Sequence, residues 1–219
     1  MKVITAFSIV LLSFVFVSAQ NEQSPIVAKT INYRNWSYKN LSGDGQTDLR
    51  AFTQGKKLVM VVYWAPWCPN WRHDVAFVQG LHERYGDKGL AVIGVSNYAK
   101  VSEMKNHTSF YKLTFPNVFD SVSTTDRLTT EHYQQRTVAG DTRKWGTPWY
   151  IFLEPGKLES QGDVIARNVD LVNGELIKDE AEKYIREKLG LGANAIGKIG
   201  KNEIEVCDPA TNASALNKP

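Results

Sequence analysis

The chain has 219 residues, of which 42% are apolar, and a formal net charge of +3. This apolar content is ordinary for a globular protein with a substantial core. The positive charges form no long basic block, so the composition gives no support to nucleic-acid binding. After residue 19 no apolar run is long enough to cross a membrane, which takes about 20 residues.

The N-terminal residues are typical of a signal peptide. Lys2 supplies a short positive start, residues 4–17 are almost uninterrupted apolar residues, and small residues follow at 18–19. We therefore predict cleavage before Gln20 and export of the protein, which would be secreted or periplasmic. An uncleaved membrane anchor is the alternative, although the apolar run is short for a span of about 20 residues.

The rest of the chain is divided by composition. We predict a signal peptide (1–19), an exposed lead-in (20–34), one domain (35–190) with a polar insertion at about 120–144, and a C-terminal tail (191–219). The turn signal at 42–45 separates short strand-like pieces within 35–50.

A cysteine lies at the first strand-to-helix junction of the domain. Residues 58–63 are all apolar or aromatic, as in a buried parallel strand, and an amphipathic helix is predicted from about 69 to 85. Pro69 suits the first helical position, which leaves Cys68 at the start of the helix. The partial positive charge of a helix N-terminus favours a thiolate there.

The remaining elements follow in chain order. A strand at 90–96 after this helix implies a parallel pair joined by a right-handed crossover. Further predicted elements are a helix at about 98–111, a helix near 127–136 within the insertion, strands at 149–153 and 163–170, and a closing helix whose apolar face runs from 177 to 189.

These segments resemble the thioredoxin superfamily, in particular its exported redoxin or TlpA-like branch. The resemblance covers residues 35–190 and is carried by Trp64-Ala65-Pro66-Trp67-Cys68-Pro69, by the strand at 90–96 and by Gly146-Thr147-Pro148. It implies an α/β fold, a thioredoxin-like three-layer sandwich with a central mixed sheet flanked by helices. It also implies that Pro148 is cis, and that Thr147 and Pro148 contact an extended peptide substrate.

The site departs from the family pattern at two positions. Trp71 stands where the second cysteine of the motif would fall, and Val62 stands where the thioredoxin branch has a buried acid. A mixed disulfide is normally resolved by a second thiolate, so the usual internal release step is missing. Cys68 is then either a reactive monothiol or a vestigial thiol on a binding scaffold. Cys207 is a candidate resolving thiol, but it could equally form a structural disulfide or remain free.

The other aromatic and polar residues near the motif are expected in the core, at the substrate surface or in solvent. Trp64 and Trp149 are expected in the core, and Trp67, Pro69 and Trp71 at the substrate surface. Two charged helix residues, His73 and Asp74, are expected to be solvated. The remaining histidines, His82, His107 and His132, have no metal-ligand spacing, so we predict neither a metal site nor a cofactor.

These observations predict an exported thiol–disulfide oxidoreductase that acts through Cys68 on a protein or peptide thiol or disulfide, with an external thiol as reductant. A non-catalytic binding module with an aromatic peptide groove is the alternative. A redoxin-type peroxidase is the weaker one, because Val61 and Ala65 occupy positions where the peroxidatic pattern has a proline and a hydroxyl residue.

Overall fold

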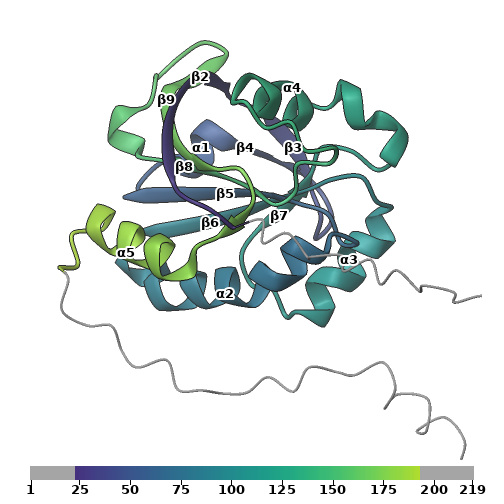
Figure 1. Cartoon of the computed structure of the whole chain (residues 1–219), viewed down its shortest axis with the longest axis horizontal. Coiled ribbons are helices and arrows are strands. Elements are labelled where there is room, and N and C mark those ends of the chain that lie inside the picture. Colours follow the sequence, from purple (N-terminus) through teal and green to yellow (C-terminus); the bar gives the residue numbers. More distant parts are fainter. Residues whose placement is uncertain (1–22, 193–219) are drawn as a thin grey trace, which may run out of the picture.

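The fold is that of a computed structural model, which describes residues 23–192 (Figure 1). The predicted signal peptide and Cys207 lie outside this range. Among the residues described, no helix has both the length and the apolar character needed to cross a membrane.

An eight-stranded mixed sheet forms the centre of the molecule. Its strand order is β2-β9-β8-β5-β6-β7-β3-β4, with β5, β6 and β7 parallel to one another and the other neighbours antiparallel. The strands are β2 (Val27–Arg34), β3 (Ser37–Asn40), β4 (Gln46–Asp48), β5 (Leu58–Trp64), β6 (Leu90–Ser96), β7 (Asn117–Phe119), β8 (Trp149–Leu153) and β9 (Val164–Val172).

Helices cover both faces of the sheet, which confirms the predicted three-layer architecture (Figure 1). Helices α2 (Pro69–Tyr85), α3 (Val101–Phe110) and α5 (Lys178–Lys188) pack on one face, and α1 (Leu49–Thr53) and α4 (Glu131–Val138) lie on the other. Short 3-10 helices occupy Gly86–Lys88, Thr124–Thr129 and Pro155–Lys157.

Strand β5 divides its side chains between two cores. Met60, Val62 and Trp64 face the layer that contains α2, whereas Val59 and Val61 face the opposite layer. This alternation follows from the two-residue period of a strand. All seven residues of β5 are buried, as expected for a central strand covered on both faces.

The prediction of an exposed lead-in at 20–34 is wrong for its described part. Strand β1 (Gln23–Ser24) pairs with β10 (Glu175–Leu176), and β2 forms an edge of the main sheet against β9. Ile31 and Tyr33 are buried in this edge strand. Asn32 between them and Arg34 after them face solvent, so the C-terminal half of the strand has the alternating pattern of a half-buried strand rather than that of an exposed tail.

The elements around Cys68 agree with the sequence predictions. Helix α2 spans Pro69–Tyr85, with Cys68 as its N-cap and proline at the first helical position. The predicted insertion contains the Thr124–Thr129 3-10 helix and α4, which starts four residues later than the helix expected near 127–136. The sheet edge formed by β2 and the long-range side-chain contacts around Cys68 were not visible in the sequence.

Candidate active site

Cys68 lies where β5 passes into α2, at the carboxyl end of the central parallel strands. Its side chain is almost completely buried, and within the described residues the thiol is free. The Cys68 Sγ donates a hydrogen bond to the backbone oxygen of Thr147 at 3.2 Å. The sulfur therefore lies between the N-terminus of α2 and the backbone oxygen of Thr147.

The turn that supplies this carbonyl comprises residues 145–148. The Thr147–Pro148 peptide bond is cis, and Gly146 has a φ of 63°. Glycine suits this position for two reasons: its backbone adopts the left-handed region, and a Cβ there would come within 2.4 Å of the Arg136 side chain. Both Thr147 and Pro148 are buried, so an incoming chain would meet this turn through its backbone rather than through these side chains.

Trp67 precedes the cysteine and is partly exposed, as predicted for a substrate-contacting residue. Its indole Nε1 donates to the backbone oxygen of Tyr98 at 3.0 Å, and its ring meets Trp145 edge-on with centroids 5.1 Å apart. The cations of Arg127 and Lys144 each lie 5.5 Å from the centroid of Trp145. The result is an aromatic wall with a cationic edge beside the reactive sulfur.

An open groove of about 760 Å³ lies between the start of α2 and helix α3. Trp67 and Arg72 line it from the motif side, and Phe110 and Tyr111 line it from the other side. Phe110 is 76% exposed, which is unusual for so large an apolar side chain. Pro69 is exposed at the first turn of α2.

The prediction that Trp71 contacts a substrate is wrong. Its side chain has no exposed surface, because it points into the core from the first turn of α2. The indole Nε1 donates to His107 Nε2 at 2.8 Å, and the ring stacks on Trp64. Burial, followed by the nearby Arg72 cation, lowers the pKa of His107 to about 4, so this histidine is neutral and can accept the hydrogen bond.

The prediction that Asp74 is a solvated helix residue is wrong. Instead of being solvated, it is fully buried. Its Oδ2 accepts hydrogen bonds from the Tyr150 hydroxyl at 2.7 Å and from the Leu176 backbone N–H at 2.8 Å. Tyr150 pairs with Val62 across β5 and β8, so a carboxylate from α2 lies on the sheet face where the strand itself carries only Val62.

The surroundings of Asp74 shift its own pKa and that of Tyr150. Burial raises the pKa of Asp74 above its ordinary value, against the hydrogen bonds from Leu176 and Tyr150. Burial, then the Asp74 carboxylate, raises the pKa of Tyr150, and the Cys68 thiol contributes to the same shift. Tyr150 and Asp74 therefore form a buried hydrogen-bonded pair. The link was invisible to sequence reasoning because it joins residues 76 positions apart.

His73 is exposed, as predicted, but it is not isolated. Its Nδ1 lies 3.3 Å from Asp74 Oδ1 and 3.1 Å from Glu175 Oε2. The three side chains offer ligand atoms that all lie within 4.8 Å of one another, an arrangement compatible with a metal ion. No local spacing could reveal this cluster, because Glu175 comes from β10, about a hundred residues away.

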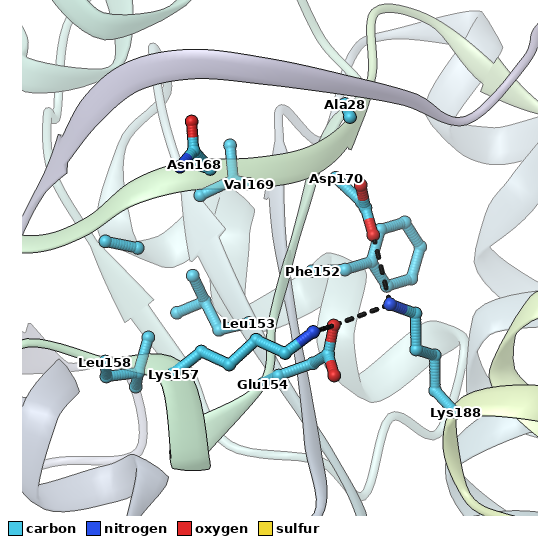
Figure 2. A pocket seen from close by; sticks show the side chains of 11 residues that line it. Ala28, Phe152, Leu153, Glu154, Lys157, Leu158, Asn168, Val169, Asp170 and Lys188 are labelled. Atoms are coloured by element: carbon cyan, nitrogen blue, oxygen red, sulfur yellow. Dashed lines mark hydrogen bonds and ion pairs between the residues drawn. The ribbon is translucent and has the colours of Figure 1, made fainter.

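A second cavity, of about 250 Å³, lies away from Cys68 (Figure 2). It is formed around the C-terminal end of β8, where Leu153 pairs with Val59 near the start of β5. Figure 2 shows the Glu154 carboxylate between the amines of Lys157 and Lys188, with Asp170 also paired to Lys188. These positive and negative charges balance one another. The residues that line this cavity include no thiol like that of Cys68.

The sequence matches the AhpC/TSA family over residues 32–142. The chain belongs to the AhpC/TSA family. Among characterised proteins it is similar to the thioredoxin-like protein YneN of Bacillus subtilis, with 35% identity over 89 residues, covering 39% of this chain and 50% of YneN. It is also similar to the thiol-disulfide oxidoreductase ResA of Oceanobacillus iheyensis, with 26% identity over 133 residues, covering 60% of this chain and 57% of ResA. The chain thus spans only about half the length of these relatives.

Solved structures support the same fold. A DsbF homologue from Corynebacterium diphtheriae superimposes with a TM-score of 0.52 at 17% identity, covering 78% of this chain and 90% of the homologue. A thiol:disulfide interchange protein of the thioredoxin family from Chlorobium tepidum gives a TM-score of 0.51 at 16% identity, covering 74% and 98%. The fold of this member of the AhpC/TSA family is therefore thioredoxin-like, as the motif predicted.

Proposed function

We propose that this protein is a thiol–disulfide oxidoreductase that acts through the single thiol of Cys68. The observation that carries the proposal is the position of Cys68, which is the N-cap residue of helix α2 and whose sulfur lies against the Thr147 carbonyl of the cis-proline turn. The similarity to a thiol-disulfide oxidoreductase supports the same chemistry.

The chemistry is an exchange of sulfur–sulfur bonds. The Cys68 thiolate attacks one sulfur of a partner disulfide, which forms a mixed disulfide with Cys68 and releases the other partner sulfur as a thiolate. An external thiolate then attacks the partner sulfur of this mixed disulfide, which frees Cys68 as a thiolate and leaves the partner bonded to the external thiol. Both steps conserve electrons, so no further oxidant is needed.

Trp71 makes an external thiol necessary for this scheme, since position 71 carries an indole buried in the core. Cys207 is the alternative resolving thiol and lies outside the described residues. If Cys207 attacks the Cys68 sulfur, the partner leaves as a thiolate and a Cys68–Cys207 disulfide remains, which an external reductant must then reduce.

The test uses the full-length protein and a peptide that carries a mixed disulfide with glutathione. Reduction of the peptide is followed in excess glutathione for the wild type, Cys68→Ser and Cys207→Ser. We expect at least a tenfold loss of rate in Cys68→Ser and a wild-type rate in Cys207→Ser. A loss in both variants, with a trapped peptide adduct on Cys207→Ser, would make Cys207 the resolving thiol. Equal rates in all three proteins would refute the proposal.

A binding module is the second candidate, and the exposed Phe110 beside Trp67 is the observation that favours it. In this function the groove holds an extended, apolar partner without chemistry at the sulfur. An unfolded, cysteine-free polypeptide should then bind the wild type and Cys68→Ser equally, and Phe110→Ala should weaken binding about tenfold. Retention of full affinity in Phe110→Ala would remove this candidate.

We also propose export of the protein, on the basis of the charged, apolar and small-residue pattern of its first 19 residues. Expression in a bacterial host followed by cell fractionation and intact mass measurement tests this. Export predicts a product that begins at Gln20 outside the cytoplasm. A full-length product in the membrane fraction would indicate the uncleaved anchor instead.

A further inference from the structure

Three side chains with metal-ligating atoms meet where helix α2 approaches β10. His73 and Asp74 are neighbours near the start of α2, and Glu175 is the first residue of β10. The Nδ1 atom of His73 lies 3.1 Å from Glu175 Oε2 and 3.3 Å from Asp74 Oδ1. One imidazole nitrogen and two carboxylate oxygens therefore converge on one point.

These separations fit the coordination sphere of a zinc-type ion. Zinc binds imidazole nitrogen at about 2.0–2.1 Å and carboxylate oxygen at about 2.0–2.2 Å, so two ligand atoms of a tetrahedral site lie about 3.3–3.5 Å apart. Both separations that involve His73 are close to this value. The two carboxylate oxygens lie within 4.8 Å of each other, and rotation of the Glu175 side chain can bring them closer.

A second layer of hydrogen bonds holds Asp74 in the orientation that a ligand needs. Its Oδ2 accepts from the Tyr150 hydroxyl at 2.7 Å and from the Leu176 backbone N–H at 2.8 Å, which leaves Oδ1 towards His73. Ligating carboxylates in metal sites are held by outer hydrogen bonds of this kind. Leu176 directly follows Glu175 on β10, so the bond from its N–H also brings the third ligand to α2.

The charges of the cluster favour a divalent cation. Asp74 is fully buried, and a buried carboxylate is costly unless a positive group compensates it. Lys178 is the nearby amine, but its Nζ donates to the backbone oxygen of His73. We propose that His73, Asp74 and Glu175 form a binding site for a zinc-type divalent metal ion. Oxygen-seeking ions such as Mg²⁺ and Ca²⁺ fit less well, because one of the three ligands is an imidazole.

The site would link two parts of the fold and remain open to solvent. A bound ion would join α2, which begins at the Cys68 N-cap, to β10. Three protein ligands leave a fourth position for water or another ligand, and the His73 side chain is about half exposed, so an ion can enter. The inference goes beyond the proposed function and needs no chemistry at the Cys68 sulfur.

Zinc titration of the untagged full-length protein tests the site. All proteins carry Cys68→Ser and Cys207→Ser, so that no thiolate binds the metal, and affinity is measured by competition with a chromophoric chelator. We expect one zinc ion per chain in this parent protein. His73→Ala and Glu175→Gln should each weaken binding at least tenfold, because loss of a supporting group alone costs about 10- to 100-fold in metal affinity. Tyr150→Phe, which removes such a support from Asp74, should weaken it about tenfold.

Two matched variants and a second measurement complete the test. His82→Ala and Glu180→Gln make the same substitutions away from the cluster, so their affinities should stay within about twofold of the parent. Zinc at a hundredfold excess over the dissociation constant should raise the thermal unfolding midpoint of the parent by about 5–10 °C, and that of His73→Ala by much less. Absent or only weak multi-site binding in the parent would overturn the inference. So would unchanged affinity in His73→Ala and Glu175→Gln, or an equal loss in the two matched variants.

Discussion

On one flank of Cys68, three residues along helix α2, Trp71 is buried against Trp64 and His107 as part of the core. On the other flank, the 145–148 turn reaches the sulfur through a backbone oxygen and is supported by polar side chains of the 120–144 segment. The first flank holds no group that could resolve a mixed disulfide. The second holds the backbone oxygen that accepts the hydrogen bond from the sulfur. The comparison is consistent with the proposed function, in which Cys68 attacks a disulfide and release depends on a thiol from elsewhere.

The largest expected effect on stability concerns the flank packed around Trp71. Trp71→Ala should lower the free energy of unfolding by about 3–5 kcal/mol, because a fully buried indole is replaced by a cavity. Trp71→Phe is the matched control: it keeps a large ring and loses mainly the hydrogen bond to His107, which costs about 1 kcal/mol. Chemical denaturation measures both. A cost below 1 kcal/mol for Trp71→Ala would mean that position 71 is not part of the core.

A smaller effect on stability is expected at the 145–148 turn. Gly146→Ala should cost about 2–3 kcal/mol, because alanine is strained at a φ of 63° and its Cβ would approach the Arg136 side chain to 2.4 Å. Gly140→Ala is the control, since its φ is 88° but no atom lies within 4 Å of the added carbon, and about 1 kcal/mol is expected. The thermal or denaturant midpoints report the difference. Equal costs at the two glycines would show that Arg136 does not pack tightly on the turn.

A third effect, absent near neutral pH, is a pH dependence of stability that belongs to the flank packed around Trp71. The pKa of His107 is lowered by burial to about 4 from its ordinary 6.5, so between these values the unfolded chain binds a proton that the folded chain does not. Stability due to His107 is therefore full above about pH 6.5 and is lost as the pH falls towards 4, by at most about 1.4 kcal/mol per pH unit.

The variant His107→Gln isolates this contribution, because glutamine can accept the hydrogen bond from Trp71 but does not titrate. The comparison is needed because burial raises the pKa of Asp120 to about 6, and this group makes an opposite contribution over part of the same range. As the pH is lowered from 7 to 4, the free energy of unfolding should fall more steeply for the wild type than for the variant. Parallel profiles would show that His107 titrates normally.

The sequence was sufficient for the features that depend on local patterns. The uninterrupted apolar run at 58–63, the proline after Cys68 and the amphipathic spacing beyond it predicted β5, the N-cap cysteine and α2. These features follow from residues close together in the chain, where strand and helix periods and proline geometry act directly. The family motif added the expected architecture and the turn at Pro148.

Tertiary structure decided what the side chains contact. Asp74 has the spacing of a solvated helix residue, and only the approach of Tyr150 and of the Leu176 backbone makes it a buried acceptor. Trp71 was expected at the substrate surface as part of an aromatic cluster at one end of the sheet, but helix α3 covers it with His107. The segment before residue 35 becomes a strand only by pairing with β9, more than a hundred residues later.

By itself, then, the sequence determined the strand-helix-strand order and the place of Cys68 at the start of α2, because both depend on short-range hydrophobic patterns and backbone preferences. The resemblance of its motifs to a known family implied the thioredoxin-like frame. Only the tertiary structure decided that position 71 is core, that Asp74 is buried and that Arg143 meets the sulfur at a shared carbonyl oxygen. Burial and hydrogen bonding are set by distant segments brought together on folding, which no local pattern records.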